Sequence, residues 1–70
     1  MIDGAKIRLL RNDMDKTVAE MAFYVGISEA MLRQIELERK KPSVETLKHI
    51  ADYLNISTDS LFKAVEANNS

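Results

Sequence analysis

Apolar residues recur along the chain at helical spacing, in short segments separated by residues that start or end helices. The first segment predicts a helix over residues 3–13, because Ile7, Leu10 and Met14 lie on one helical face. Four further segments follow, with these inward-facing positions: Met21, Ala22 and Val25; Leu32 and Ile35; Leu47, Ile50, Ala51 and Leu54; and finally Leu61, Phe62 and Val65. The pattern therefore predicts an all-α chain of five helices.

The residues between these segments indicate where each helix begins and ends. Thr17 and Glu20 have the spacing of a capping box, in which the hydroxyl and the carboxylate each bind a backbone amide of the other residue. Gly26 stands where the second helix must reverse into the third, as expected of a residue in the left-handed conformation. The caps expected for the later helices are Ser28, Ser43, and Ser57 or Thr58.

The length of 70 residues allows one compact core. We expect one domain over residues 1–66 and a frayed tail over residues 67–70. The chain has no cysteine, so disulfides and thiolate metal sites are excluded. The sequence shows neither a leader segment nor an apolar run of about 20 residues that could span a membrane, and we expect a cytoplasmic protein.

The charge distribution is slightly asymmetric. The net charge is −1, whereas DNA-binding domains tend to be basic. Residues 6–41 carry eight basic and six acidic side chains, and residues 42–70 carry two basic and four acidic ones. The first part of the chain is therefore the part suited to a polyanion, although its excess of positive charge is small.

The second and third segments form the arrangement that indicates a function. Ala22 is the small residue at which the two helices cross, and Gly26 follows four residues later as the turn. Leu32 and Ile35 hold the third helix by its inner face, so that residues 28–33 project outward. The major groove of DNA is about 12 Å wide and accepts one α-helix, which makes a protruding helix end suited to reading bases.

At this point the sequence resembles the Cro and phage-repressor (Xre-like, lambda-repressor-like) helix-turn-helix family over roughly residues 6–63. The matching stretches are Lys6–Arg11, Thr17–Ala22, Val25–Ser28, Ile35–Glu36, Lys41–Leu47 with Ile50–Ala51, and Leu54–Ser57 with Leu61–Phe62. The resemblance implies a DNA-binding transcriptional regulator, with double-stranded DNA as its partner and helices 2 and 3 as the helix-turn-helix.

The resemblance also implies roles for individual residues. The implied DNA-binding set is Thr17, Val18, Ser28, Glu29, Ala30, Met31, Arg33, Gln34, Arg39, Lys40 and Lys41. Gln34 suits adenine, Arg33 guanine, and Glu29 a cytosine amino group. Unpaired amides at the start of the second helix and the basic run at 39–41 suit phosphates. The alternative for the helix face is a solvated surface in which Glu29 and Arg33 pair.

Two further roles concern stability and assembly. Arg11 and Glu36 stand at positions that form an internal ion pair in the family. Leu61, Phe62 and Val65 form an apolar face on the last helix that suits a homodimer over a palindromic site, with closure of the monomer core as the alternative. The sequence departs from the family pattern at Lys16, Val18, Glu29 and Glu38, which indicates weaker or unusual DNA affinity.

The remaining chemistry points away from catalysis. The sequence has no Gly-rich phosphate loop and no nucleophile placed beside a base, and its single histidine, His49, is expected on the surface. We therefore expect no enzyme activity, no metal, no cofactor and no small-molecule substrate. The competing function is a helix-turn-helix scaffold that binds a protein partner through Glu29, Met31 and Leu37.

Overall fold

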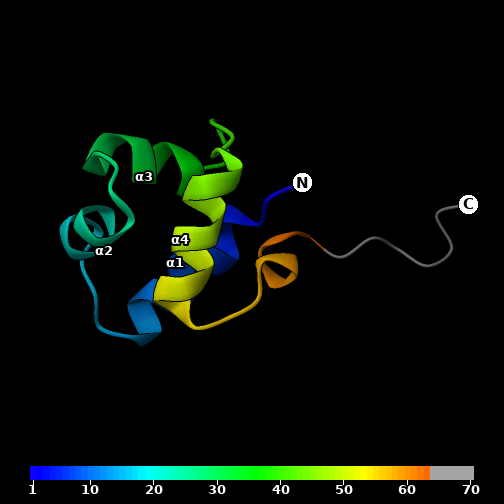
Figure 1. The fold of residues 1–70 in the computed structure, drawn as a ribbon. Helices are drawn as coiled ribbons and strands as arrows, with labels where there is room; N and C mark the ends of the chain where they lie inside the picture. The colour runs from blue at the N-terminus through cyan, green and yellow to red at the C-terminus, as the bar shows by residue number, and fades with distance from the viewer. Residues whose placement is uncertain (64–70) are drawn as a thin grey trace, which may run out of the picture.

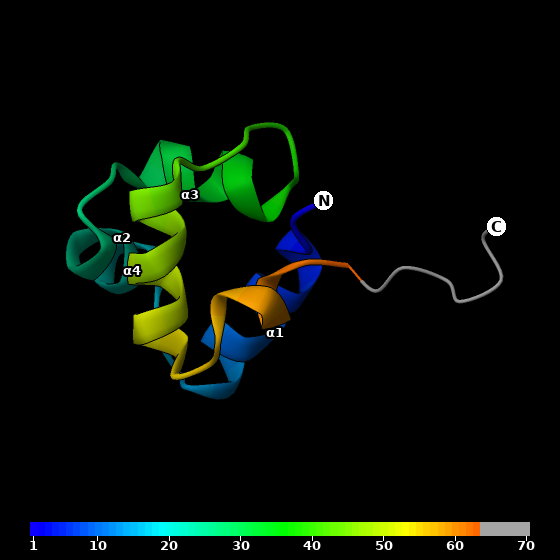
Figure 2. The same cartoon turned by 45° about the vertical axis from the view of Figure 1, so that its right-hand side comes forward.

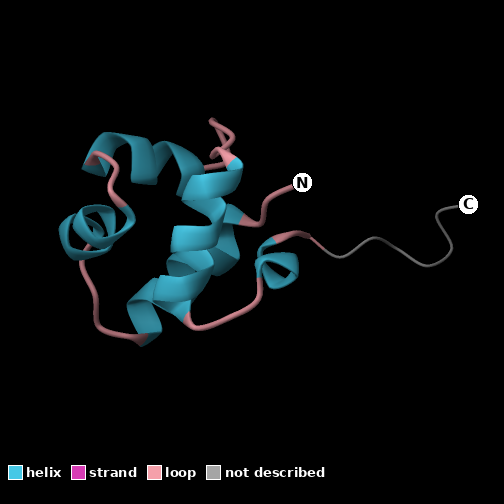
Figure 3. Cartoon of the chain, in the orientation of Figure 1, coloured by secondary structure: helices cyan, strands magenta, loops and turns pink. Residues whose placement is uncertain are grey.

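The computed structural model describes residues 1–63. Over these residues the chain forms four α-helices and one short 3₁₀ helix: α1 (Gly4–Asp13), α2 (Val18–Val25), α3 (Glu29–Glu36), α4 (Val44–Leu54) and η1 (Thr58–Leu61) (Figures 1 and 3). The all-α expectation is confirmed over this range. None of the helices found there has the length and apolar character required to cross a membrane.

The helices begin at the capping residues that the sequence predicts. Thr17 and Glu20 form the complete capping box of α2, and Ser28, Ser43 and Ser57 each accept a hydrogen bond from an amide in the first turn that follows. Gly26 closes α2 in the left-handed conformation with φ of 85°. These local signals explain why the first four helices match the expected bounds closely.

The core lies where α1, α2, α3, α4 and η1 meet. α4 packs against α1, α2 and η1, while α3 packs against α1 and α2 (Figure 2). The buried apolar residues are Ile7, Met21, Ala22, Val25, Leu32, Ile35, Ile50, Ala51, Leu54 and Leu61. Met14 was predicted to face inward and does not, because it follows the end of α1 and is 38% exposed.

The fifth α-helix is not present over the described residues. After η1 the chain turns extended at Phe62, which forms an antiparallel bridge with Ile2. Asp3 donates its amide to the Leu61 carbonyl at 2.7 Å, and the Lys63 amide donates to Met1 at 2.8 Å. In a continuing helix, the Leu61 carbonyl and the Lys63 amide would bond to other residues of that helix, but here they bond to the amino-terminal segment. Pairing with this segment therefore takes the place of the expected α-helix beyond Leu61. Val65, the domain boundary at 66 and the tail at 67–70 lie outside the described residues.

Leu61 is fully buried in the single chain, which favours the alternative of core closure over the predicted role in a dimer. It therefore closes the core and is not available to a dimer. Phe62, which is 42% exposed, is the described member of the predicted dimer set that remains accessible.

Glu38 joins the two ends of the described chain. It adopts the left-handed conformation with φ of 62°, which explains why a glycine or a small polar residue suits this position. Its carboxylate accepts from the Gly4 amide at 2.8 Å and from Lys63 Nζ at 2.7 Å. The hydrogen bond from Lys63, followed by the one from Gly4, lowers the pKa of Glu38. This contact ties the start of α1 to the end of α3.

Gly4 allows α1 to approach the end of α3 closely. A β-carbon at this position would lie 2.6 Å from the carbonyl oxygen of Ile35 and closer still to that of Glu36. Both of these atoms belong to the backbone, which cannot rotate away as a side chain can. Position 4 therefore requires glycine because a side chain would collide with the backbone of α3. Position 26 requires glycine because its φ is positive.

We predict that Gly4→Ala lowers the free energy of unfolding by about 1–3 kcal/mol, because the added methyl group forces α1 away from α3. Urea denaturation followed by circular dichroism measures the change. Asp13→Ala is the matched control, since Asp13 is an exposed residue at the other end of α1 and an alanine there leaves stability the same or slightly higher. Equal midpoints for Gly4→Ala and the unmodified chain would show that the contact is not tight.

Candidate nucleic-acid interface

The two faces of α3 differ sharply. Leu32 and Ile35 are fully buried and Glu36 is 9% exposed, so the inner face is held by the core. Glu29, Ala30 and Arg33 are exposed on the other side. Figures 1 and 2 show α3 along one edge of the molecule, with no other described element on its outer side. The arrangement leaves a helix face open to a large partner.

The junction between α2 and α3 sets the direction of this helix. Ala22 is 2% exposed, and its carbonyl accepts the amides of both Gly26 and Ile27, at 2.9 and 3.0 Å. The chain therefore reverses within a few residues, and Ile27 packs against the core directly after the turn. Ser28 then begins α3 by accepting the Met31 amide at 3.0 Å. This is the close crossing that the positions of Ala22 and Gly26 predict.

The predicted base-reading residues are not equally accessible. Glu29, Ala30 and Arg33 are exposed, whereas Gln34 is half-buried and Met31 is half-buried against the core. Arg33 Nη2 lies 3.5 Å from Glu29 Oε1, and both side chains are more than half exposed. An exposed pair at this distance is weak, so both groups stay available to another partner.

The start of α2 differs from the expectation in one respect. The Thr17 amide donates to the Glu20 carboxylate at 3.0 Å and is therefore not available to a phosphate. The hydrogen bonds from Thr17 lower the pKa of Glu20. The Val18 amide remains in the first turn, where no carbonyl of the helix reaches it. Val18 itself is half-buried beside α3.

The loop after α3 carries the predicted basic run. Arg39, Lys40 and Lys41 are all exposed. The Arg39 amide donates to the Gln34 carbonyl at 2.8 Å, which continues the turn that Glu38 makes. The loop lies at the same edge of the molecule as α3 (Figure 2). The basic run and the outer face of α3 therefore border one surface.

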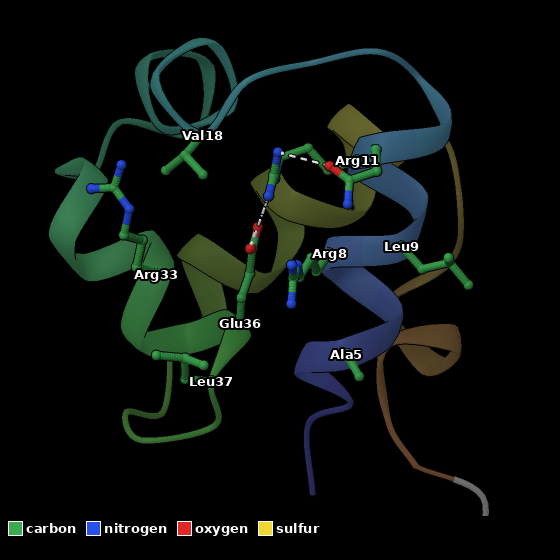
Figure 4. Close-up of a pocket in the computed structure, with 9 residues that line it drawn as sticks. Ala5, Arg8, Leu9, Arg11, Val18, Arg33, Glu36 and Leu37 are labelled. Carbon is green, nitrogen blue, oxygen red and sulfur yellow. Dashed lines mark hydrogen bonds and ion pairs between the residues drawn. The ribbon is translucent and has the colours of Figure 1, made fainter.

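The expected ion pair between Arg11 and Glu36 is present and buried. Arg11 Nε donates to Glu36 Oε2 at 2.8 Å, and Nη2 donates to Oε1 at 3.1 Å (Figure 4). Arg11 also donates to the Lys16 carbonyl at 2.8 Å. The hydrogen bond to Glu36 raises the pKa of Arg11. Since the side chains are only 9% and 6% exposed, the pair joins α1 to α3 inside the protein.

Several features of the surface were not predicted. Phe23 is 90% exposed on α2, and the rings of Tyr24 and Tyr53 lie 4.9 Å apart. A groove between α1 and α3 is lined in part by Arg8, Leu9 and Leu37. The sequence pattern did not indicate this groove, because Leu9 lies beside the apolar positions of the first helix and not among them. Within residues 1–63, no group of histidine, aspartate or glutamate side chains is arranged to hold a metal ion.

The comparisons with known proteins agree with this geometry. Residues 7–61 match the model of a helix-turn-helix family. The chain belongs to this family, the Cro and phage-repressor (Xre-like) group of DNA-binding transcription regulators.

Two relatives cover most of the chain. It is 38% identical over 58 residues to the uncharacterized HTH-type transcriptional regulator YazB of Bacillus subtilis (strain 168), covering 83% of this chain and 84% of that protein. It is similar to the P22 c2 repressor, whose crystal structure is a complex with synthetic operator 9T, with 28% identity and a TM-score of 0.85 over 90% of this chain and 96% of that one.

A second solved structure shares the fold alone. The N-terminal DNA-binding domain of SinR from Bacillus subtilis is 24% identical, with a TM-score of 0.78 over 94% of each chain.

We predict that Arg11→Ala lowers the free energy of unfolding by about 3–5 kcal/mol, because it leaves the Glu36 carboxylate buried without a partner. The double variant Arg11→Met with Glu36→Met recovers most of the loss, since no charge stays buried. Arg8→Ala, which removes an exposed arginine from the same helix, is the control. Urea denaturation gives the three values, and a loss for Arg11→Ala no larger than for Arg8→Ala would contradict a stabilising pair.

Proposed function

We propose that this chain is a sequence-specific transcriptional repressor, which places α3 in the major groove of its operator and thereby blocks polymerase. The proposal rests on one observation, which is that α3 has a buried inner face and an exposed outer face. An α-helix of this kind fits the width of the major groove. The structural likeness to the P22 c2 repressor, which is bound to an operator in its crystal structure, supports operator DNA as the partner of this chain.

Base reading falls to the exposed side chains of α3. Arg33 reaches a guanine edge, Glu29 accepts from a cytosine amino group, and Ala30 contacts a thymine methyl. Gln34 offers its amide to adenine from a half-buried position. Because Met31 packs against the core, we assign it the smallest contribution to base recognition.

Phosphate binding falls to the groups that border α3. Arg39, Lys40 and Lys41 supply the positive charge on one side, and the Val18 amide at the start of α2 supplies a donor on the other. The whole chain has a net charge of −1, so these few cations provide the electrostatic attraction locally. We therefore expect an affinity that depends steeply on salt in spite of the acidic total.

We further propose that two copies bind a palindromic site, with their recognition helices about 34 Å apart. The surface for a second copy surrounds Phe62, where a shallow apolar depression is lined by Met1, Ile2, Pro42 and Leu47 together with Lys41. Phe62 is 42% exposed there and joins these neighbours in one continuous apolar surface, the kind of surface that a second copy can cover. This depression replaces the continuous helical face that the sequence predicted.

The test is selection of bound duplexes from a random pool, followed by titration of the selected duplex at several salt concentrations. With about six phosphates neutralised per dimer, the logarithm of the association constant falls with the logarithm of salt at a slope of about −5. Lys40→Ala with Lys41→Ala reduces the slope by about two to four. Lys48→Ala, an exposed lysine on α4 outside the proposed surface, leaves it unchanged.

Failure to select any duplex, or an affinity that does not respond to salt, would contradict the proposal. Such a result would favour the competing function, in which the same scaffold binds a protein partner. Loss of selectivity among duplexes on Arg33→Ala, with non-specific binding retained, would support the assignment of α3 to base reading.

A further inference from the structure

A groove of about 640 Å³ runs between α1 and α3, beside the proposed DNA surface. It is lined by Ala5, Arg8, Leu9, Arg11, Asn12, Val18, Arg33, Glu36 and Leu37. Figure 4 shows Arg8 projecting into the space between the two helices and Leu37 at the edge on α3, while Leu9 lies at the far edge on α1 and points away from α3. Leu9 is 61% exposed and Leu37 55% exposed, so both edges offer apolar surface to solvent.

The shape of the groove suits a helix. On α1 its lining residues extend from Ala5 to Asn12, and on α3 from Arg33 to Leu37, at the spacing of successive turns. The longer side spans about 10 Å at 1.5 Å per residue, which is two helical turns. An amphipathic helix that lays its apolar face in such a groove contacts both walls at once.

The available charges of the groove are positive. Among the described residues Arg8 makes no ion pair, and Arg33 makes only the long, exposed contact with Glu29. The one carboxylate in the lining, Glu36, is already bound by Arg11 through two hydrogen bonds. A partner therefore meets two available guanidinium groups, Arg8 between the helices and Arg33 on α3, with apolar side chains at both edges of the groove, and carboxylates complement these guanidinium groups.

We infer that this groove is the docking site of an acidic amphipathic helix from a partner protein. Nucleic acid is the less suitable occupant, because a phosphate backbone gains nothing from Leu9 and Leu37. Val18 and Arg33 belong both to the groove and to the proposed DNA surface. A bound helix therefore excludes DNA, which makes the partner an inducer; this last step rests on the proposed function.

The test uses a synthetic peptide of about 15 residues, long enough to be helical in water, with leucines along one face and glutamates beside them. A second peptide carries lysine in place of each glutamate. Each is titrated into the ¹⁵N-labelled full chain without DNA. The acidic peptide gives saturable amide shifts along residues 5–12 and 33–37, and the basic peptide gives none. Equal binding of both peptides, shifts elsewhere, or no shifts at millimolar peptide would overturn the inference.

Two substitutions test the contacts, and both positions are exposed in the folded chain. Arg8→Gln and Leu9→Ser each weaken binding of the acidic peptide by about ten-fold, since each removes a main charge or apolar contact. Their matched controls on α4, Lys48→Gln and Val44→Ser, bind as the unmodified chain does. If the controls lose as much as the groove variants, the peptide does not lie in the groove.

A final titration separates the groove from the DNA surface. The acidic peptide releases the selected duplex from the unmodified chain but not from Arg8→Gln at the same concentration, and Arg8→Gln binds duplex normally. Peptide and duplex bound together would overturn the inducer role. Duplex shifts at Leu9 and Leu37 that match those of the peptide would assign the groove to DNA. If no duplex is ever selected, the proposed function fails while the peptide titration still decides the groove.

Discussion

The fold depends on how α3 is anchored. A helix of eight residues is too short to be stable alone, so its existence and its direction come from tertiary contacts. Leu32 and Ile35 fix one side in the core, and Glu36 adds a buried ion pair to Arg11. Because α3 is held along one side and no other described element covers the opposite side, the exposed face that we propose reads DNA is a consequence of this anchor.

The same anchor also shapes the groove that we propose as a docking site. The ion pair joins α1 to α3. Gly4, which has no side chain, lets the start of α1 approach the backbone at the end of α3, and the Glu38 carboxylate binds the Gly4 amide. The groove that results carries Arg8 and Leu9 on α1, while its α3 wall shares Arg33 with the proposed DNA surface. A molecule that fills the groove therefore acts on DNA binding through shared residues and needs no change of fold.

Sequence reasoning was accurate where the signal is local. Capping residues, the turn at Gly26 and the apolar stripes predict α1 to α4, because each depends on residues within one or two turns. It was wrong where distant segments decide the outcome. The amino terminus pairs with Phe62, so the helix that begins after Ser57 ends at Leu61 and does not continue as the expected last α-helix. The Arg11–Glu36 pair was foreseen only through the family resemblance, and the groove was not foreseen because it exists only between packed helices.

The most direct test of the account is the map of amide shifts that a selected duplex produces in the ¹⁵N-labelled chain. The account predicts that the shifts gather at Val18, over residues 28–34 and at residues 39–41, while the buried side of α3 and the body of α4 change little. Shifts concentrated around Phe23 and Tyr24, or around α4, would show that another face meets the DNA and that the exposed side of α3 is not the reading surface.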